Sequence, residues 1–233
     1  MSEAEGREIV LGRVQQALRT GPRLPAPLRI DLPPQPGEQS RAALIEEFKQ
    51  EWEALQGKFL RMPREDAVVR LSALLRELGV RRLLAWNEEH LPMRDLGVGL
   101  ERAGFRLEGA VLPRRDPARR ERIRQLADLE VGLTGAAAAI AQVGALVLPG
   151  GPGRARLASL LPPIHIALLT PQQFYATFEA YLTAQTQTGA SAPMLASSSS
   201  LTLVAGPSRT ADIERVLTLG VHGPGDVLVV LLE

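Results

Sequence analysis

Two apolar runs near the end of the chain restrict the fold most. Residues 201–205 read LTLVA and residues 227–232 read VLVVLL, apolar almost throughout. Strands of this kind are covered on both faces, which is typical of a parallel sheet flanked by helices. Between them, a glycine and a proline precede an amphipathic segment, which predicts a helix beginning near Ser208. Residues 200–233 therefore predict strand, turn, helix, turn and strand.

The middle of the chain repeats this alternation. Strands are predicted at residues 58–62, 81–87 and 105–112, with intervening helices that end at Gly79 and Gly104. Short connections between such units favour right-handed crossovers and a largely parallel sheet. Further strands are predicted at 131–134, 145–149 and 162–169, a small-residue helix at 135–142, and a helix capped by Thr170. The predicted fold class is α/β, with a mainly parallel sheet flanked by helices.

The front of the chain has a different character. Residues 3–19 place Ile9, Val10 and Val14 on one helical face, and residues 21–37 contain six prolines, which exclude helix. A second amphipathic helix is predicted at 38–56. We therefore expect an N-terminal helical arm with a proline-rich linker at 1–56, followed by an α/β domain at 57–233. The arm is expected to contact a partner, its own body, or a second copy in a homo-oligomer.

Composition excludes several classes of function. Lysine and arginine number 27 against 26 aspartates and glutamates, so no bulk charge attracts nucleic acid. The absence of cysteine removes disulfides, thiolate nucleophiles and iron–sulfur ligation by thiolates. No apolar run reaches the length of about 18 residues that a membrane span requires. The polar, acidic N-terminus is unlike a secretory signal, so a cytoplasmic location is expected.

Two turns in the last segment are candidate binding elements. The sequence GPSRT places Gly206, Ser208, Arg209 and Thr210 after a strand, where backbone N–H groups at a helix start would favour an anion. The same hydroxyl groups could simply cap the predicted helix. The sequence GVHGPGD places its histidine and glycine before the last strand, close enough to join such a site; these residues are His222 and Gly223.

Other residues have both a functional and a structural interpretation. Thr134, the last residue of a predicted strand, is a candidate anion-binding residue. His165 lies in an apolar strand, either as a catalytic residue or as a core histidine. The loop PGGPGR at 149–154 is a plain turn or a weak phosphate cradle, and it lacks the Lys-Ser/Thr of a nucleotide-binding loop. The three histidines have no metal-ligand spacing, so no metal site is expected. No G-x-S-x-G motif of a hydrolase occurs.

Three segments resemble the LUD (lactate utilisation) domain family, and specifically its C-subunit type. They are VGLTGAAAAIAQVG (131–144), LPPIHIALL (161–169) and AGPSRTADIERVLTLGVHGPGDVLVVLLE (205–233). The resemblance implies a fold similar to the NagB/RpiA/CoA-transferase group, and a role beside iron–sulfur partner subunits in oxidising L-lactate to pyruvate. Because fold relatives use a glutamate nucleophile, Glu130 becomes a further catalytic candidate. Where relatives commonly read AETGT, this chain reads AQVGA, so Gln142 and Ala145 replace a carboxylate and a hydroxyl.

The sequence and the resemblance together suggest two possible functions for the chain. The preferred one is an accessory subunit of an L-lactate utilisation system, which binds iron–sulfur partners and a small organic acid near Ser208 and His222, and holds no cofactor itself. The alternative is a stand-alone small-ligand-binding protein or a sugar-phosphate isomerase or transferase, which binds a phosphorylated ligand in the same cleft. In that case His222 would act as acid and base, and Thr134, Ser208 and Arg209 would bind the anion.

Overall fold

The computed structural model describes residues 3–20, 37, 39–113, 116–187, 198–211 and 217–233. The chain divides into two compact units, residues 1–34 and 35–233. In the first unit, helix α1 runs Glu3–Thr20, as the apolar spacing of residues 3–19 predicts. The side chains of Ile9, Val10 and Val14 are exposed on it.

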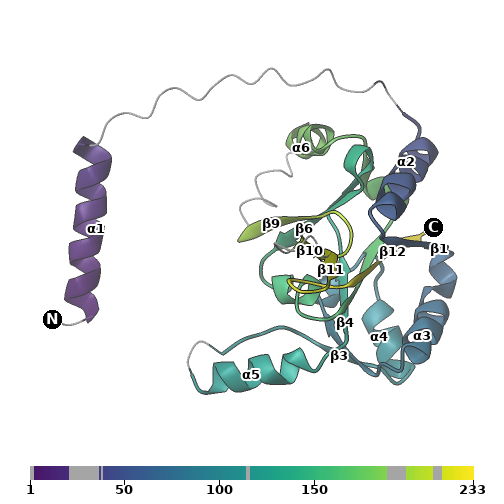
Figure 1. The fold of residues 1–233 in the computed structure, drawn as a ribbon, viewed down its shortest axis with the longest axis horizontal. Helices are drawn as coiled ribbons and strands as arrows, with labels where there is room; N and C mark the ends of the chain where they lie inside the picture. Colours follow the sequence, from purple (N-terminus) through teal and green to yellow (C-terminus); the bar gives the residue numbers. More distant parts are fainter. Residues whose placement is uncertain (1–2, 21–36, 38, 114–115, 188–197, 212–216) are drawn as a thin grey trace. The chain divides into compact units, whose positions relative to one another are not determined.

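A six-stranded, wholly parallel sheet forms the centre of the second unit (Figure 1). Its strand order is β1-β12-β7-β4-β2-β3, which confirms the predicted α/β class. The central strands are buried on both faces, as continuous apolar runs require. The strands are β1 (Lys58–Met62), β12 (Asp226–Leu232), β7 (Ile164–Leu169), β4 (Val131–Gly135), β2 (Arg82–Ala85) and β3 (Arg106–Glu108).

The helices between the first three strands form where the sequence predicts them. A turn of 3-10 helix, η1 (Arg64–Asp66), leads into α3 (Ala67–Glu77), and α4 runs Leu96–Arg102. Gly79 and Gly104 follow these helices with positive φ angles of 70° and 97°, which glycine adopts without strain. Between β2 and α4 lies the 3-10 helix η2 (Glu88–His90), and α5 (Ala118–Ala127) follows β3.

A second sheet replaces the small-residue helix predicted at 135–142. It has four strands in the order β8-β5-β6-β9: β8 (Phe174–Tyr175), β5 (Ala138–Ile140), β6 (Ala145–Gly150) and β9 (Ser200–Val204). A 3-10 turn, η3 (Ala141–Val143), joins β5 to β6. The helix prediction was wrong because pairing on both sides of β5 overrides the helix propensity of alanine.

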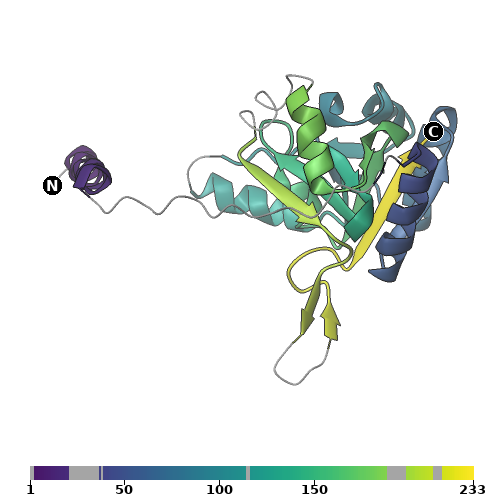
Figure 2. The ribbon, with the colours of Figure 1, turned by 90° about the horizontal axis from the view of Figure 1, so that it is seen from above.

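The predicted C-terminal helix is also absent from the described residues. Instead β10 (Arg209–Ala211) pairs antiparallel with β11 (Leu217–Leu219), while residues 212–216 lie outside the described part. Figure 2 shows these two strands extending away from the body of the unit. The hydroxyl and proline signals that resemble a helix cap stand at a bend instead, where Gly206 has a φ of 83°. In the described residues, the strands β10 and β11 therefore stand where the sequence predicts a helix.

The segment after Thr170 is more broken than predicted. Thr170 does form a capping box with Gln173, but around the single 3-10 turn η5 (Pro171–Gln173), which β8 follows. The true helix α6 runs Phe178–Gln187, and the Thr177 hydroxyl accepts a hydrogen bond from the Ala180 N–H at 3.1 Å. Thr170 therefore caps only the short turn η5, and the helix predicted to start there begins later, after Thr177.

Helix α2 (Arg41–Ala54), which the sequence groups with the arm, packs within the second unit. Phe48 and Trp52 are fully buried, and the Phe48 ring contacts the Phe174 ring edge-on at 5.4 Å between centroids. The Trp52 indole donates to the Lys58 carbonyl at 2.9 Å. A Cβ atom added to Gly57 would overlap the Trp52 ring, so glycine is required at this approach. The helix is therefore part of the α/β body.

Candidate functional site

Two of the predicted site residues meet in the buried centre of the large sheet. The Thr134 hydroxyl and His165 Nε2 are 2.8 Å apart, and both side chains are fully buried on adjacent strands β4 and β7. Burial lowers the pKa of His165 to about 4, so the imidazole is neutral at pH 7. Its Nδ1 atom has no hydrogen-bond partner among the described residues.

The cover over this pair is tight. The 3-10 turn η4 (Arg156–Ser159) packs so closely on β4 that a Cβ atom added to Gly132 would overlap the carbonyl oxygen of Ala158. Gly132 lies opposite His165 in the sheet register. The imidazole therefore has no open face toward solvent, and a structural role fits it better than acid–base chemistry.

The two glycine-containing bends, near Ser208 and near Gly223, contact each other. The Ser208 N–H donates to the Pro224 carbonyl at 2.8 Å, and the Gly220 N–H donates to the Ser208 carbonyl at 2.9 Å. The His222 N–H contacts the Ser208 hydroxyl at 3.4 Å, and a Cβ atom added to Gly223 would lie 3.5 Å from the Ser208 Cβ. These contacts bind one bend to the other.

The role of this meeting point changes because no helix starts there. The predicted anion site needed the free N–H groups of a helix start. Instead Arg209 donates from Nη2 to the Leu55 carbonyl at 2.8 Å. Gly206 also packs against Leu55. The side chain of Thr210 lies outside the described residues. In the described part, no hydrogen bond or ion pair joins the Thr134–His165 pair to Ser208 or His222.

Glu130 lies at the edge of the large sheet where the parallel strands begin. It lines a cavity of about 500 Å³ together with Gly220, Gly225 and Asp226. The Asp226 carboxylate pairs with the Lys58 ammonium at 2.5 Å. The second bend therefore borders the same hollow as Glu130, whereas Ser208 does not line it.

The opposite edge of the sheet, where the strands end, has the topology of a ligand site. The chain leaves β2 toward β3 on one side, and leaves β4 to return at β7 on the other. In open α/β sheets, ligands bind outside the carboxyl ends of two such strands. Here the ends of β2 and β4 carry residues 86–90 and 135–136, which we call the carboxyl edge. A Cβ atom added to Gly135 would lie 2.5 Å from the His90 carbonyl oxygen, so the two segments are in close contact.

A loop at residues 150–156 is fixed over this edge by hydrogen bonds. Gly151 and Arg154 exchange backbone hydrogen bonds at 3.1 and 3.0 Å, and the Asn87 N–H donates to the Gly153 carbonyl at 2.9 Å. The Trp86 indole donates to the Ala155 carbonyl at 3.2 Å. Gly153 has a φ of 70° and lies against His90 and Asn87, so the tight turn requires glycine here.

This loop and the two residues before β9 line a cavity of about 440 Å³. Its lining residues include Arg154, Arg156, Ser198 and Ser199. The sequence shows the two arginines next to a glycine-rich loop, but it gives no signal for the serines, which approach only because β9 pairs with β6. Residues 188–197, which precede these serines, lie outside the described part of the chain.

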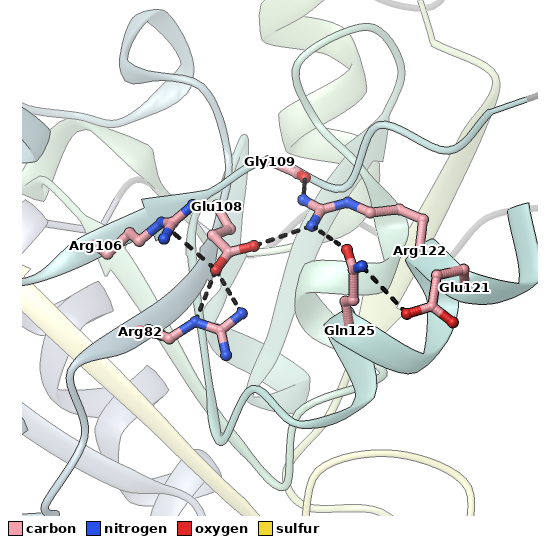
Figure 3. Close-up of polar contacts among 7 residues, drawn as sticks. All are labelled: Arg82, Arg106, Glu108, Gly109, Glu121, Arg122 and Gln125. Carbon is pink, nitrogen blue, oxygen red and sulfur yellow. Dashed lines mark hydrogen bonds and ion pairs between the residues drawn. The ribbon is translucent and has the colours of Figure 1, made fainter. Parts of the chain in front are cut away.

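A buried carboxylate stands at a second cavity on the carboxyl edge. Glu108 ends β3 and accepts hydrogen bonds from Arg82 at 2.8 Å and Arg122 at 3.1 Å, with Arg106 at 3.9 Å (Figure 3). Burial opposes its charge, but the hydrogen bonds and charges of Arg82 and Arg122 outweigh burial and lower the pKa of Glu108. Glu108, Glu88 and Glu101 line a cavity of about 370 Å³.

The described residues contain no group of three histidines, cysteines, aspartates or glutamates that could hold a metal ion. None of the helices in the described part has the length and apolar character needed to cross a bilayer. Gln142, at the departure from the family pattern, is exposed in η3, and its N–H donates to the Ala176 carbonyl at 3.1 Å. Ala145 is buried at the start of β6.

Comparison with known proteins gives a consistent set of relatives. The model of the LUD domain matches residues 45–232. The chain is 31% identical over 166 residues to lactate utilization protein C of Halalkalibacterium halodurans, which covers 69% of this chain and 66% of that protein. It is 37% identical over 119 residues to lactate utilization protein C of an Exiguobacterium species, 51% of each chain. It is also 30% identical over 164 residues to the uncharacterized protein YkgG of Escherichia coli, 69% of this chain and 66% of that protein.

These matches span half to two thirds of the relatives' own lengths. Among solved structures, the fold is similar to that of a DUF162 family protein from Deinococcus radiodurans. The TM-score is 0.56 at 20% identity, and the match covers 84% of this chain and all of that one. That likeness concerns the fold alone. From the matched family model and these relatives we conclude that the chain belongs to the LUD domain family, and within it to the lactate utilization protein C and YkgG type.

Proposed function

We propose that this chain is an accessory subunit of an L-lactate utilisation system, which oxidises L-lactate to pyruvate with iron–sulfur partner proteins. The observation that carries the proposal is the match of residues 45–232 to the LUD domain, with relatives named lactate utilization protein C. The sequence contains no cysteine, so clusters ligated by thiolates must belong to other chains. This chain would then supply binding and assembly, and the partners would accept the electrons.

Binding of a small organic acid belongs to the same proposal. Oxidation of L-lactate needs its carboxylate held while hydrogen is removed from the neighbouring carbon, and arginine is suited to holding a carboxylate. Arginine side chains line the cavity above the carboxyl edge. The alternative, a stand-alone enzyme or sensor for a phosphorylated ligand, is favoured by the same arginines, because guanidinium groups bind phosphate equally well.

The experiment is a deletion with complementation in the source organism. We expect the deletion strain to lose growth on L-lactate but to keep growth on pyruvate, and the restored gene to recover growth on L-lactate. In parallel, tagged protein from lactate-grown cells should co-purify with cysteine-rich proteins that carry iron and sulfide. Normal growth on L-lactate without this chain, or purification of the chain alone with turnover of a phosphorylated ligand, would contradict the proposal.

A further inference from the structure

Strand β9 leaves one backbone edge of the small sheet open. It is the last strand in the order β8-β5-β6-β9, so β6 pairs with one side of it and no strand of the described part pairs with the other. Figure 2 shows β9 at the margin of the second unit. The N–H and C=O groups along such an edge can pair with a strand of another chain.

This edge lacks the features that usually prevent such pairing. Residues 200–204 read SLTLV, with no charged residue and no proline. Each end strand of the large sheet contains charged side chains, such as Arg61 in β1 and Arg106 in β3. Strand β8, at the other end of the small sheet, has only two residues. Charge or short length protects those edges, whereas neither protects β9.

The side chain of Leu203 is exposed beside this edge. It is 55% exposed, although it lies opposite the buried Val147 in the register with β6. Leu201 lies on the same face of the strand and packs against the small hydrophobic cluster around Tyr181. A further apolar side chain next to Leu203 would therefore extend a cluster that already exists.

The direction of the backbone groups on β9 follows from its neighbours. The Val147 carbonyl accepts a hydrogen bond from the Ala137 N–H at 2.8 Å, so the backbone groups of Val147 point toward β5 and away from β9. Because this direction alternates along an antiparallel strand, the groups of Leu148 point toward its register partner Thr202. The leucines on either side of Thr202 therefore point their N–H and C=O groups out of the sheet edge.

From this geometry we propose that β9 pairs antiparallel with β9 of a second copy of the chain, about a two-fold axis that passes through Thr202. In this register Leu201 of each copy lies opposite Leu203 of the other, and the two residues exchange backbone hydrogen bonds. The two four-stranded sheets then become one sheet of eight strands.

The sequence of β9 favours a second copy over a different chain. The order Leu-Thr-Leu at 201–203 is the same in both directions, so the two-fold axis sets leucine against leucine and threonine against threonine. Apolar pairs and threonine pairs both stabilise antiparallel strands. No charge meets a like charge, because residues 200–204 contain none. A strand that pairs with a different protein does not need this symmetry.

The pairing also places the second copy beside a cavity. Ser199, directly before β9, is among the residues that line the cavity of about 440 Å³ at the 150–156 loop. In the proposed register Ser199 lies opposite Ala205 of the other copy. Each copy therefore borders the cavity of the other.

Cross-linking through one introduced cysteine tests the register. The chain contains no cysteine, so Thr202→Cys provides a single thiol per chain. Opposed residues that do not hydrogen-bond to each other lie about 4.5 Å apart at Cα in antiparallel strands, and a disulfide requires about 4.4–6.8 Å. We expect dilute Thr202→Cys to form a disulfide-linked dimer on mild oxidation. The matched control Val111→Cys, at a side chain that is 81% exposed, should keep a free thiol under the same conditions.

Analytical ultracentrifugation of the full chain tests the interface. We expect the wild type to sediment with twice the mass of one chain. Leu203→Lys should raise the dissociation constant of the dimer by about tenfold or more, because two leucine pairs are lost in each dimer and lysine blocks a strand edge. Val111→Lys changes an exposed apolar side chain outside β9 and should leave the dimer intact.

The dimer would be overturned by a wild type that stays monomeric at every concentration, including one whose β9 binds a different protein instead. A dimer that Leu203→Lys leaves intact, or in which Thr202→Cys does not cross-link, would form through another surface and would also overturn it. Circular dichroism and thermal melting of each variant separate lost association from lost folding.

Discussion

At the scale of single residues, Glu108 is a buried carboxylate bound by arginine side chains. Its side chain is 7% exposed and contacts three arginines. The Glu108→Gln change removes the charge to which these guanidinium groups are bound, while the arginines themselves stay partly exposed to water. Because hydrogen bonds to a charged group typically contribute about 1.5–3 kcal/mol, we expect Glu108→Gln to lower the free energy of unfolding at pH 7 by about that amount. Urea denaturation at pH 7 measures this difference.

The same variant has a predictable dependence on pH. Because the pKa of Glu108 is lowered in the folded state, its stabilisation is complete above the unfolded pKa of about 4.3 and is lost as pH falls through the folded value. The gap between wild type and Glu108→Gln should therefore close below about pH 4. Arg120→Gln is a control, since its ion pair with Asp116 is exposed. A gap that stays constant down to pH 3 would contradict the role of the carboxylate charge.

His165 is kept neutral in the folded state, whereas Glu108 is kept charged. Both effects nevertheless make the protein less stable as pH falls. The unfolded histidine takes up a proton below about pH 6.5, whereas the folded one does so only near pH 4. Stability should therefore fall as pH decreases from 6.5 to 4, by at most about 1.4 kcal/mol per pH unit. His165→Gln should remove this slope, although it weakens the fold at pH 7. His222→Gln, which changes an exposed side chain, should keep the slope.

The residues themselves show what sequence can and cannot provide. Thr134 and His165 could each be recognised as unusual polar residues in apolar strands, but the pairing of β4 with β7 decides that they bond to each other. The burial of Glu108 could not be predicted from the segment FRLEGAVL, because two of its three arginine contacts come from β2 and α5. Ser198 and Ser199 reach the cavity only through the pairing of β9 with β6.

At the scale of elements, η4 packs closely on β4 at Gly132. Gly132 lies on a central strand, and any side chain there would meet the Ala158 backbone. Backbone atoms cannot move aside as a flexible side chain can, so we expect Gly132→Ala to destabilise the protein by about 3 kcal/mol or more. Gly109→Ala is the matched control, because nothing lies within 4 Å of a Cβ atom there. Thermal melting of the two variants measures the difference, and equal melting temperatures would contradict the packing.

Elements were predictable where one local signal dominated. The apolar run at 227–232 identified β12 of the large parallel sheet, and Gly79 and Gly104 marked the helix ends. The apolar run at 201–205 did form a strand, but the prediction of a parallel strand covered on both faces was wrong, because β9 pairs antiparallel with β6 and is partly exposed. The alanine-rich stretch 135–142 favours a helix locally, yet its small side chains serve strand β5, which is buried between two other strands. The GPSRT turn resembles a helix cap, but the chain continues as a hairpin. In both cases partners distant in sequence decide the outcome.

At the scale of the whole molecule, helix α2 separates the part needed for folding from the part that is not. Residues 1–34 form their own unit, while Phe48 and Trp52 are buried in the second. We expect deletion of residues 1–34 to leave the melting temperature of the α/β body within about 2 °C, since the described residues of its hydrophobic core all belong to the second unit. Deletion of residues 1–56 removes two large aromatic side chains and should prevent folding. A folded product of the longer deletion would show that α2 is dispensable.

The α/β class could be predicted from the alternation of strand and helix segments. The extent of the N-terminal arm, predicted as residues 1–56, could not. The stripe of Leu44, Phe48 and Trp52 shows that α2 packs against something, but amphipathic spacing does not say whether the partner is the same chain or another. Likeness to the NagB/RpiA/CoA-transferase group stays a prediction, as does a cytoplasmic location.

The placement of β12 has a consequence for how the protein is made. This strand fills the gap between β1 and β7, and it joins Lys58 to Asp226 across 168 positions of sequence. During synthesis β1 leaves the ribosome long before β12, and until β12 is made the backbone N–H and C=O groups on that edge of β1 have no strand partner. The large sheet can be completed only after β12 has been translated. Until then β1 and β7 have unpaired edges that a chaperone could bind.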